Sequence, residues 1–229
     1  MRIQIITSCT GAKRYSPKNQ LQQVDFRQMY NKLTFSTCEN TLSNFRVPAI
    51  EMYTGQQHIR LTEGIASFQA SHPNSQIDLW VLSAGYGLIS GTQPIVPYEC
   101  TFQEMRNKEI VNWSTFLRIP QSAKEIFCQS FDLLIIALGE KYLRSLQLDV
   151  DTVFASPTLF ISKQSGSKFI QGKGQMNTIP LSLLDTTRFS CGMVGLKGEI
   201  AKRILKFVAE GNPISSLFVS GNEVLAFLK

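Results

Sequence analysis

Apolar and polar residues form alternating blocks along the chain, and these blocks predict strands followed by helices. Short runs of Ile, Leu, Val and aromatic residues that end at small or polar residues are typical of buried strands. Longer stretches with apolar residues on one face indicate helices. The predicted strands cover residues 2–7, 77–82 and 131–138, with shorter ones at 152–155 and 179–182. The predicted helices lie within residues 58–68, 101–117, 122–128, 140–143, 192–207 and 217–228.

This alternation predicts an α/β fold with a mainly parallel sheet flanked by helices. At 229 residues the chain is long enough to bury a sizeable core, and its hydrophobic fraction of 43% is ordinary for a globular protein. No long linker or internal repeat divides it. We therefore expect residues 1–229 to form a single α/β domain. Within it, residues 1–143 carry the sequence motifs, and residues 144–229 add a basic loop and C-terminal helices.

The sequence lacks the patterns of a membrane or exported protein. No apolar run approaches the roughly 20 residues that span a bilayer. Residues Met1–Ile6 enter a strand directly and carry no signal-peptide pattern. We expect a cytoplasmic protein with no membrane partner.

The positive charge changes the expected partners. A formal net charge of +6 favours polyanions such as nucleic acid, although many basic proteins bind none. Gly, Ser and Lys dominate residues 160–179, which predicts a mobile basic loop or hairpin. We expect Lys163, Lys168 and Lys173 of this segment to contact a DNA phosphate backbone. A solvated hairpin without a partner would have the same composition.

Cysteine and histidine usage argues against a metal centre. The five cysteines are scattered and form no CxxC pair, and the chain has two histidines. This pattern predicts neither a zinc site nor a disulfide framework. We expect most of the cysteines to be buried thiols, and His58 and His72 to be structural or surface residues. No metal or organic cofactor is implied.

Two predicted strands end in residues suited to ligand binding. The first runs into Ser8–Lys13, and ligands in open α/β sheets lie beyond the carboxyl ends of strands. This segment lacks Walker A spacing, so nucleotide hydrolysis gains little support, and a polar surface loop remains an alternative. The second strand stops at Ser83–Gly87, whose small residues let the backbone turn and approach a ligand. Pro97–Glu99 then forms a corner that carries an aromatic ring and a carboxylate. An ordinary glycine turn would explain the second strand end equally well.

These segments together resemble a known group of proteins. Ser8–Lys13, Met52–Gly55, Leu82–Ile89 and Pro97–Glu99 resemble a bacterial and phage group with an LSA-x-(Tyr/His)-GL core. That group is distantly similar to the YaaA peroxide-stress proteins and to the core of archaeosine synthase. The resemblance covers residues 3–143. Relatives often carry Asp after the tyrosine, where this chain has Glu99, so a carboxylate is kept with a reach longer by one methylene.

The resemblance implies an activity on nucleobases. Relatives recur near 7-deazaguanine modification and phage-defence functions, and one anti-phage member is a DNA glycosylase that removes glucosylated hydroxymethylcytosine. The resemblance therefore implies a DNA glycosylase that excises a modified base, such as that one, and leaves an abasic site. Two alternatives stay open: a non-catalytic DNA-binding stress or defence protein, and a base-exchanging or base-modifying transferase that acts on tRNA.

The expected site residues follow from this chemistry. Cleavage of an N-glycosidic bond builds positive charge on the sugar, and a carboxylate stabilises that charge or activates water. The expected catalytic residues are Glu99, Tyr98 and Lys13, and Glu51, Glu140 and Asp185 are alternative carboxylates. We expect Tyr86 or Tyr98 to stack on the flipped base. The expected substrate-binding residues are Ser8, Cys9, Thr10, Gly11, Tyr53, Ser83, Ala84, Gly85, Tyr86 and Gly87.

Overall fold

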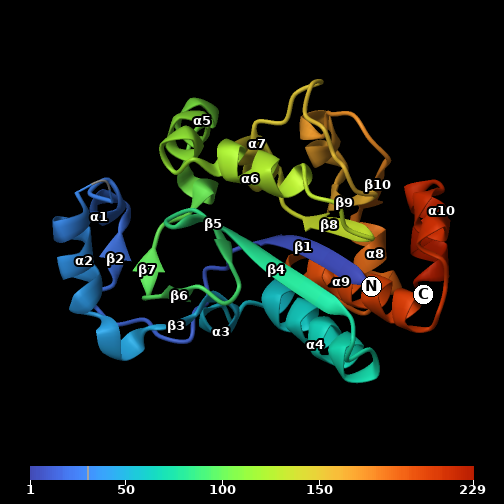
Figure 1. The fold of residues 1–229 in the computed structure, drawn as a ribbon, viewed down its shortest axis with the longest axis horizontal. Coiled ribbons are helices and arrows are strands. Elements are labelled where there is room, and N and C mark those ends of the chain that lie inside the picture. The colour runs from blue at the N-terminus through green and yellow to red at the C-terminus, as the bar shows by residue number, and fades with distance from the viewer. Residues whose placement is uncertain (30) are drawn as a thin grey trace.

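A mainly parallel β-sheet lies at the centre of the computed structural model, which describes residues 1–29 and 31–229 (Figure 1). Neighbouring strands pair in parallel except at one edge, where β5 runs antiparallel to β4. The predicted α/β fold is confirmed. In spatial order the strands are β10 (Met176–Leu181), β9 (Thr158–Lys163), β8 (Leu133–Ala137), β1 (Arg2–Ser8), β4 (Gln76–Ser83) and β5 (Gly87–Ser90).

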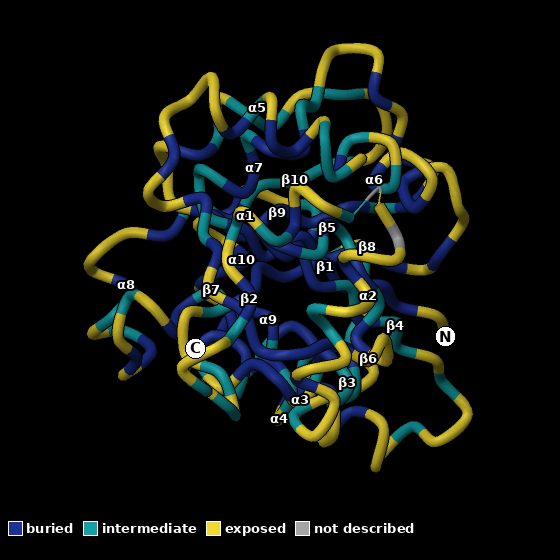
Figure 2. The backbone as a smooth tube through the Cα atoms, turned by 90° about the vertical axis from the view of Figure 1, so that its left-hand side faces the viewer, coloured by how far each residue is buried: buried dark blue, intermediate teal, exposed yellow. Residues whose placement is uncertain are grey.

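The central strands are buried on both faces, which explains their continuous apolar sequences. Every residue of β8 is buried, and so is β1 from Ile3 onward. Figure 2 shows this buried backbone in the middle of the molecule. Helices cover both faces of the sheet (Figure 1). One layer contains α4 (Gln56–Ser71) and α9 (Met193–Ala209), and the other contains α5 (Asn107–Phe116), α6 (Ile119–Phe127) and α7 (Glu140–Leu146).

The strand order creates a crevice at the carboxyl edge of the sheet. Numbered along the chain, the parallel strands β1, β4, β8, β9 and β10 have the spatial order 2-1-3-4-5. The chain therefore passes from β1 to one side of the sheet and later reaches β8 on the other side. The loops after β1 and β8 diverge at this switch point, which is where doubly wound sheets bind ligands.

A lobe of short elements lies beside the β5 edge of the sheet (Figure 1). Its aromatic core is Phe26, which is fully buried and packs edge-on against Tyr86 and Tyr98. The parallel ladder of β2 and β7 places Gln22 opposite Glu99. Tyr30, which falls in this part of the sequence, lies outside the described residues. The elements of the lobe are β2 (Leu21–Gln22), α1 (Gln23–Phe26), α2 (Lys32–Asn40), a 3-10 turn (Ser43–Phe45), β3 (Val47–Pro48), α3 (Ala49–Met52), β6 (Pro94–Ile95) and β7 (Tyr98–Glu99).

The C-terminal part of the chain completes the sheet, and two predictions about it were wrong. Residues 152–155 form no strand, because the segment makes only an isolated bridge from Val153 to Lys173. Its apolar character is explained by Phe154, which is buried and packs against Phe127 and Phe160. Residues 160–179 form no hairpin, because β9 and β10 pair in parallel around a 3-10 helix, η3. The remaining elements are η2 (Phe102–Glu104), η3 (Gln164–Phe169), α8 (Leu183–Arg188), η4 (Ile214–Phe218) and α10 (Gly221–Phe227).

Across the described part of the chain, no helix has both the length and the apolar character needed to cross a membrane.

Candidate functional site

Two cavities lie on either side of a short wall, residues 101–107, which follows β7. We call the one at the crevice between the loops after β1 and β8 the sheet-edge cavity, and the one beside the small lobe the lobe cavity. They measure about 960 and 750 Å³, within the usual size range of ligand sites. Thr101 lines both cavities. The ammonium of Lys141 donates to the carbonyl oxygens of Gln103 and Met105 and so fixes the wall in place.

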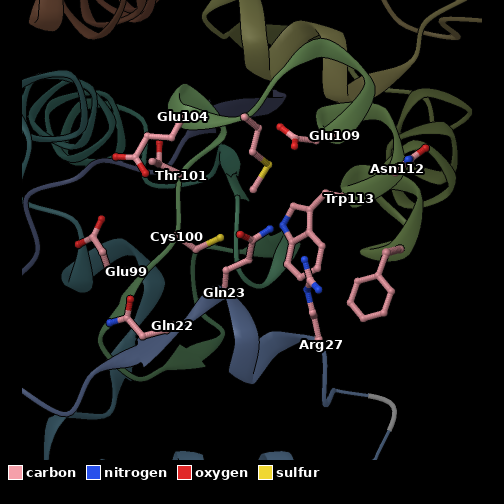
Figure 3. A pocket seen from close by; sticks show the side chains of 12 residues that line it. Gln22, Gln23, Arg27, Glu99, Cys100, Thr101, Glu104, Glu109, Asn112 and Trp113 are labelled. Carbon is pink, nitrogen blue, oxygen red and sulfur yellow. The ribbon is translucent and has the colours of Figure 1, made fainter.

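The lobe cavity combines polar groups with an aromatic surface. Figure 3 shows Gln22, Gln23 and Arg27 on one wall, from β2 and the α1 region, and Glu104 and Glu109 on the opposite wall. The Trp113 and Phe116 rings are stacked 4.9 Å apart, and both residues line the cavity. The lining residues are Gln22, Gln23, Arg27, Glu99, Cys100, Thr101, Glu104, Met105, Glu109, Asn112, Trp113 and Phe116.

Glu99 lines the lobe cavity with an exposed side chain, held by the β2–β7 ladder. Glu104 and Glu109 also line this cavity. Glu109 is committed to capping α5, because its carboxylate accepts from the Arg106 backbone N–H at 2.7 Å and from the guanidinium at 2.8 Å. Glu99 and Glu104 therefore offer the cavity two carboxylates that no capping interaction uses, and only Glu99 follows the proline corner.

Lys13 lines neither cavity, although it follows the Ser8–Gly11 segment and the charge of Glu99 acts on it electrostatically. Its Nζ is 4.5 Å from the centre of the Tyr98 ring and donates to the Gly11 carbonyl oxygen at 3.3 Å. Burial lowers the pKa of Lys13, and the electrostatic influence of Cys9 and Glu99 opposes this shift only in part. A partly desolvated lysine of this kind gives up its proton more readily than an exposed one.

Tyr98 does not lie at the surface of a cavity, so it cannot stack on a flipped base as expected. Its side chain is fully buried. Its hydroxyl is 2.7 Å from Ser83 Oγ and 2.9 Å from the Tyr53 hydroxyl, which is also buried. Burial raises the pKa of Tyr98 and of Tyr53 well above the ordinary value. Neutral, mutually bonded hydroxyls tie the corner before Glu99 to the end of β4.

The turn Ser83–Gly87 also lines neither cavity, which corrects the expected contacts of Ser83, Ala84, Gly85, Tyr86 and Gly87 with a base. Ser83 Oγ accepts from the N–H of Gly85 at 3.2 Å and of Tyr86 at 2.9 Å. A Cβ on Gly85 would lie 2.6 Å from the Phe26 ring, so glycine is needed for close packing. The Tyr86 hydroxyl donates to Glu39 at 2.9 Å. These residues therefore pack within the lobe and support its structure.

The segment Ser8–Gly11 does line the sheet-edge cavity, at the carboxyl end of β1. Thr10 is fixed there, because its hydroxyl donates to Ala12 O at 2.7 Å and accepts from Gly55 N at 3.2 Å. Cys9 Sγ is 3.1 Å from the hydroxyl of Tyr142, which belongs to α7, the helix that follows β8. The opposite rim includes Lys163 and Lys197.

The structure separates the three predicted DNA-backbone lysines. Lys163 lines the sheet-edge cavity. Lys168 lies in the 3-10 helix η3 and pairs with Glu140 at 3.4 Å. Lys173 pairs with Asp151 at 2.8 Å. They do not form one basic loop, because the segment between Lys163 and Lys173 is folded against the sheet.

The alternative carboxylates are engaged elsewhere. Glu51 forms an exposed ion pair with Arg14 at 2.8 Å and lines neither cavity. Asp185 caps α8, accepting from Ser182 N at 2.8 Å and Ser182 Oγ at 2.7 Å. Glu140 lines the sheet-edge cavity but is the residue paired with Lys168.

The sequence interpretation missed several lining residues. Trp113 and Phe116 were recognised only as part of an apolar helix face. Their i, i+3 spacing was the available signal, but a helix face does not reveal whether it meets a core or a cavity. Arg27 carried no motif, and Lys197 was predicted only as part of the glycine-containing helix start within residues 192–207. His58 is buried, its Nε2 lies 2.8 Å from Ile50 O, and its structural role is confirmed. Within residues 1–29 and 31–229, no group of three or more His, Cys, Asp or Glu side chains could hold a metal ion.

Comparison with known proteins gives a family but no activity. Residues 33–159, more than half of the chain, match the model of DUF6884, a family of unknown function. No curated protein matches the sequence.

Proposed function

Because the chain belongs to the DUF6884 family, whose function is unknown, its role must be inferred from its site, and we propose that it is a DNA glycosylase. The proposed substrate is a modified nucleobase of DNA, such as glucosylated hydroxymethylcytosine, and the biological setting is anti-phage defence. The observation that carries the proposal is the placement of the exposed Glu99 carboxylate on the lobe cavity, which the stacked Trp113 and Phe116 rings also line.

The lobe cavity supplies what a flipped base needs. Base-acting enzymes hold the extruded nucleotide in a pocket by stacking and by hydrogen bonds. Trp113 and Phe116 provide the aromatic surface, and Gln23, Asn112 and Arg27 provide side-chain donors. A volume of about 750 Å³ leaves room for a sugar substituent beside a pyrimidine, and the carboxylate and amide groups suit sugar hydroxyls.

The proposed reaction is hydrolysis of the N-glycosidic bond. The bond between base and C1′ breaks, its electron pair leaves with the base, and C1′ gains oxocarbenium character. The Glu99 carboxylate stabilises this charge and takes a proton from the attacking water. The departing base takes a proton from water in the cavity, and Lys13 is a positioning residue, because its ammonium lies over the Tyr98 ring and acts on Glu99 electrostatically. Water and nucleotide thus yield free base and an abasic site.

The test is mass spectrometry of small molecules released from normal DNA and from DNA with glucosylated hydroxymethylcytosine. We expect the wild type to release the modified base, and Glu99→Gln to reduce the rate by about 10²-fold or more while DNA binding persists. Glu51→Gln is the matched control, because Glu51 is equally exposed but lines neither cavity.

Two results would change the proposal. If a folded Glu99→Gln protein released base at the normal rate, the catalytic role would move to another carboxylate. If no DNA or RNA ever yielded a free base or an abasic site, the glycosylase proposal would fail. The protein would then be understood as a non-catalytic DNA-binding protein.

A further inference from the structure

The sheet-edge cavity holds two lysines whose charges are not neutralised by the protein. Lys163 is the last residue of β9, and Lys197 lies in the first turns of α9; both line this cavity. In the described part of the chain, neither ammonium has a hydrogen bond or ion pair. Lys197 is partly buried, and the positive charge of Lys163 acts on it electrostatically. Two like charges that line the same cavity repel each other, and an anion bound in that cavity would compensate both.

Backbone amides at the same cavity add to its positive potential. The helices α4 and α9 contain 16 and 17 residues, and both begin at the cavity. Each starts at a glycine N-cap, Gly55 and Gly192, and neither start has a side-chain capping hydrogen bond. The first amides of a long helix carry partial positive charge and commonly bind phosphate.

The other charged groups at this cavity have partners. Glu140 pairs with Lys168 at 3.4 Å, so its negative charge is already compensated. Lys141 is committed to the carbonyl oxygens of Gln103 and Met105. The uncompensated charge at the cavity is therefore that of Lys163 and Lys197.

We propose that the sheet-edge cavity is a phosphate-binding site in which Lys163, Lys197 and the amide ends of α4 and α9 hold a phosphate mono- or diester. A phosphate group matches the site because it accepts hydrogen bonds from several directions and compensates both lysines at once. Burial, with a smaller effect of Lys163, lowers the pKa of Lys197 to about 8, and a bound anion would raise it again. The wall of residues 101–107 separates this site from the lobe cavity, and Glu99 does not line it, so the proposal does not depend on base excision.

The test is isothermal titration calorimetry at pH 7 with inorganic phosphate, deoxycytidine monophosphate and a single-stranded oligodeoxynucleotide. We expect Lys197→Gln and Lys163→Gln each to weaken phosphate binding by roughly tenfold or more, as expected for losing a charged hydrogen bond. Lys197→Arg keeps the charge and should retain most of the affinity. Lys206→Gln is the matched control, because Lys206 lies on the same helix, is exposed and pairs with Glu210 at 3.7 Å.

The three probes distinguish the sources of the phosphate. Tighter binding of the mononucleotide than of the oligonucleotide identifies a free nucleotide as the ligand, and the reverse identifies a nucleic-acid backbone. The proposal is overturned if no probe binds, or if a folded Lys197→Gln protein binds phosphate as well as the wild type. Because base release is not measured, failure here leaves the glycosylase proposal standing, and failure of that proposal leaves this one standing.

Discussion

Replacement of Lys197 by methionine is expected to stabilise the protein while it removes the phosphate site. Methionine is unbranched and similar in length, so it retains most of the packing of the lysine stem. What the substitution removes is an unpaired ammonium that the folded protein partly desolvates. A substitution that stabilises a protein and abolishes ligand binding is typical of a residue that is retained for its function.

The magnitude follows from the pKa of Lys197, which falls from its ordinary value of 10.5 to about 8 on folding. One pKa unit corresponds to about 1.4 kcal/mol, so the charged form is disfavoured by at most about 3 kcal/mol. Because the side chain still reaches the solvent in the cavity, we expect a gain of about 1–3 kcal/mol in the free energy of unfolding at pH 7.

The sign of the pH dependence is fixed by the same pKa. Between about pH 8 and pH 10.5 the unfolded chain keeps the Lys197 proton while the folded protein has lost it. The stability of the wild type therefore rises with pH through this window, relative to the variant. The advantage of Lys197→Met should be full below about pH 8 and small near pH 10.

The assay is urea unfolding of wild type, Lys197→Met and Lys206→Met at pH 7 and pH 10, with and without phosphate. The Lys206 variant should change by less than about 0.5 kcal/mol, because its ion pair is exposed. Phosphate at about 100 times its dissociation constant should stabilise the wild type by about 2.7 kcal/mol and the Lys197 variant much less. Equal stability of wild type and Lys197→Met at both pH values would refute the reasoning, because it would mean that folding does not desolvate this charge.

Two further predictions concern the other predicted site residues. Tyr98→Phe should lower the free energy of unfolding by about 1–3 kcal/mol, because Ser83 and Tyr53 lose a buried partner; lost base release in a protein of unchanged stability would instead indicate a catalytic tyrosine. If DNA phosphates enter the sheet-edge cavity, Lys163→Ala should lower the log–log salt slope of DNA binding by about 0.9 per lost contact, whereas Lys173→Ala should leave it nearly unchanged because Lys173 pairs with Asp151. Equal slopes for the two variants would contradict this assignment.

The strands that the sequence predicted well are those buried on both faces. The continuous apolar run of β8 is typical of a central strand, and β1 is buried from Ile3 onward, whereas β4 is continuously buried only from Val81 to its end. Strand β9 was missed because its apolar part, Leu159–Ile161, is brief and lies between a proline and a Gly/Ser/Lys-rich segment. Its strand character comes from pairing with β8 and β10, which local composition does not encode.

Site residues could be predicted where the sheet topology places them at the ligand-binding edge, but not where their role depends on which side chains become buried. Ser8–Gly11 follows the first strand, and a parallel sheet places such a segment at its ligand-binding edge. The sequence of Ser83–Gly87 suggested the same, but that turn is filled by Phe26, from a lobe whose position no local pattern reveals. The role of Lys197 could not be predicted for a related reason, because the sequence shows that it is charged but not that folding partly buries its ammonium.

The wall between the two cavities is one short segment that lines both of them. Glu104 and Met105 contribute to the lobe cavity, Gln103 and Asn107 to the sheet-edge cavity, and Lys141 holds the backbone between them. A ligand that shifts this segment from one side alters the space on the other. Linkage then requires reciprocity: by whatever factor occupancy of the first cavity changes affinity in the second, occupancy of the second changes affinity in the first.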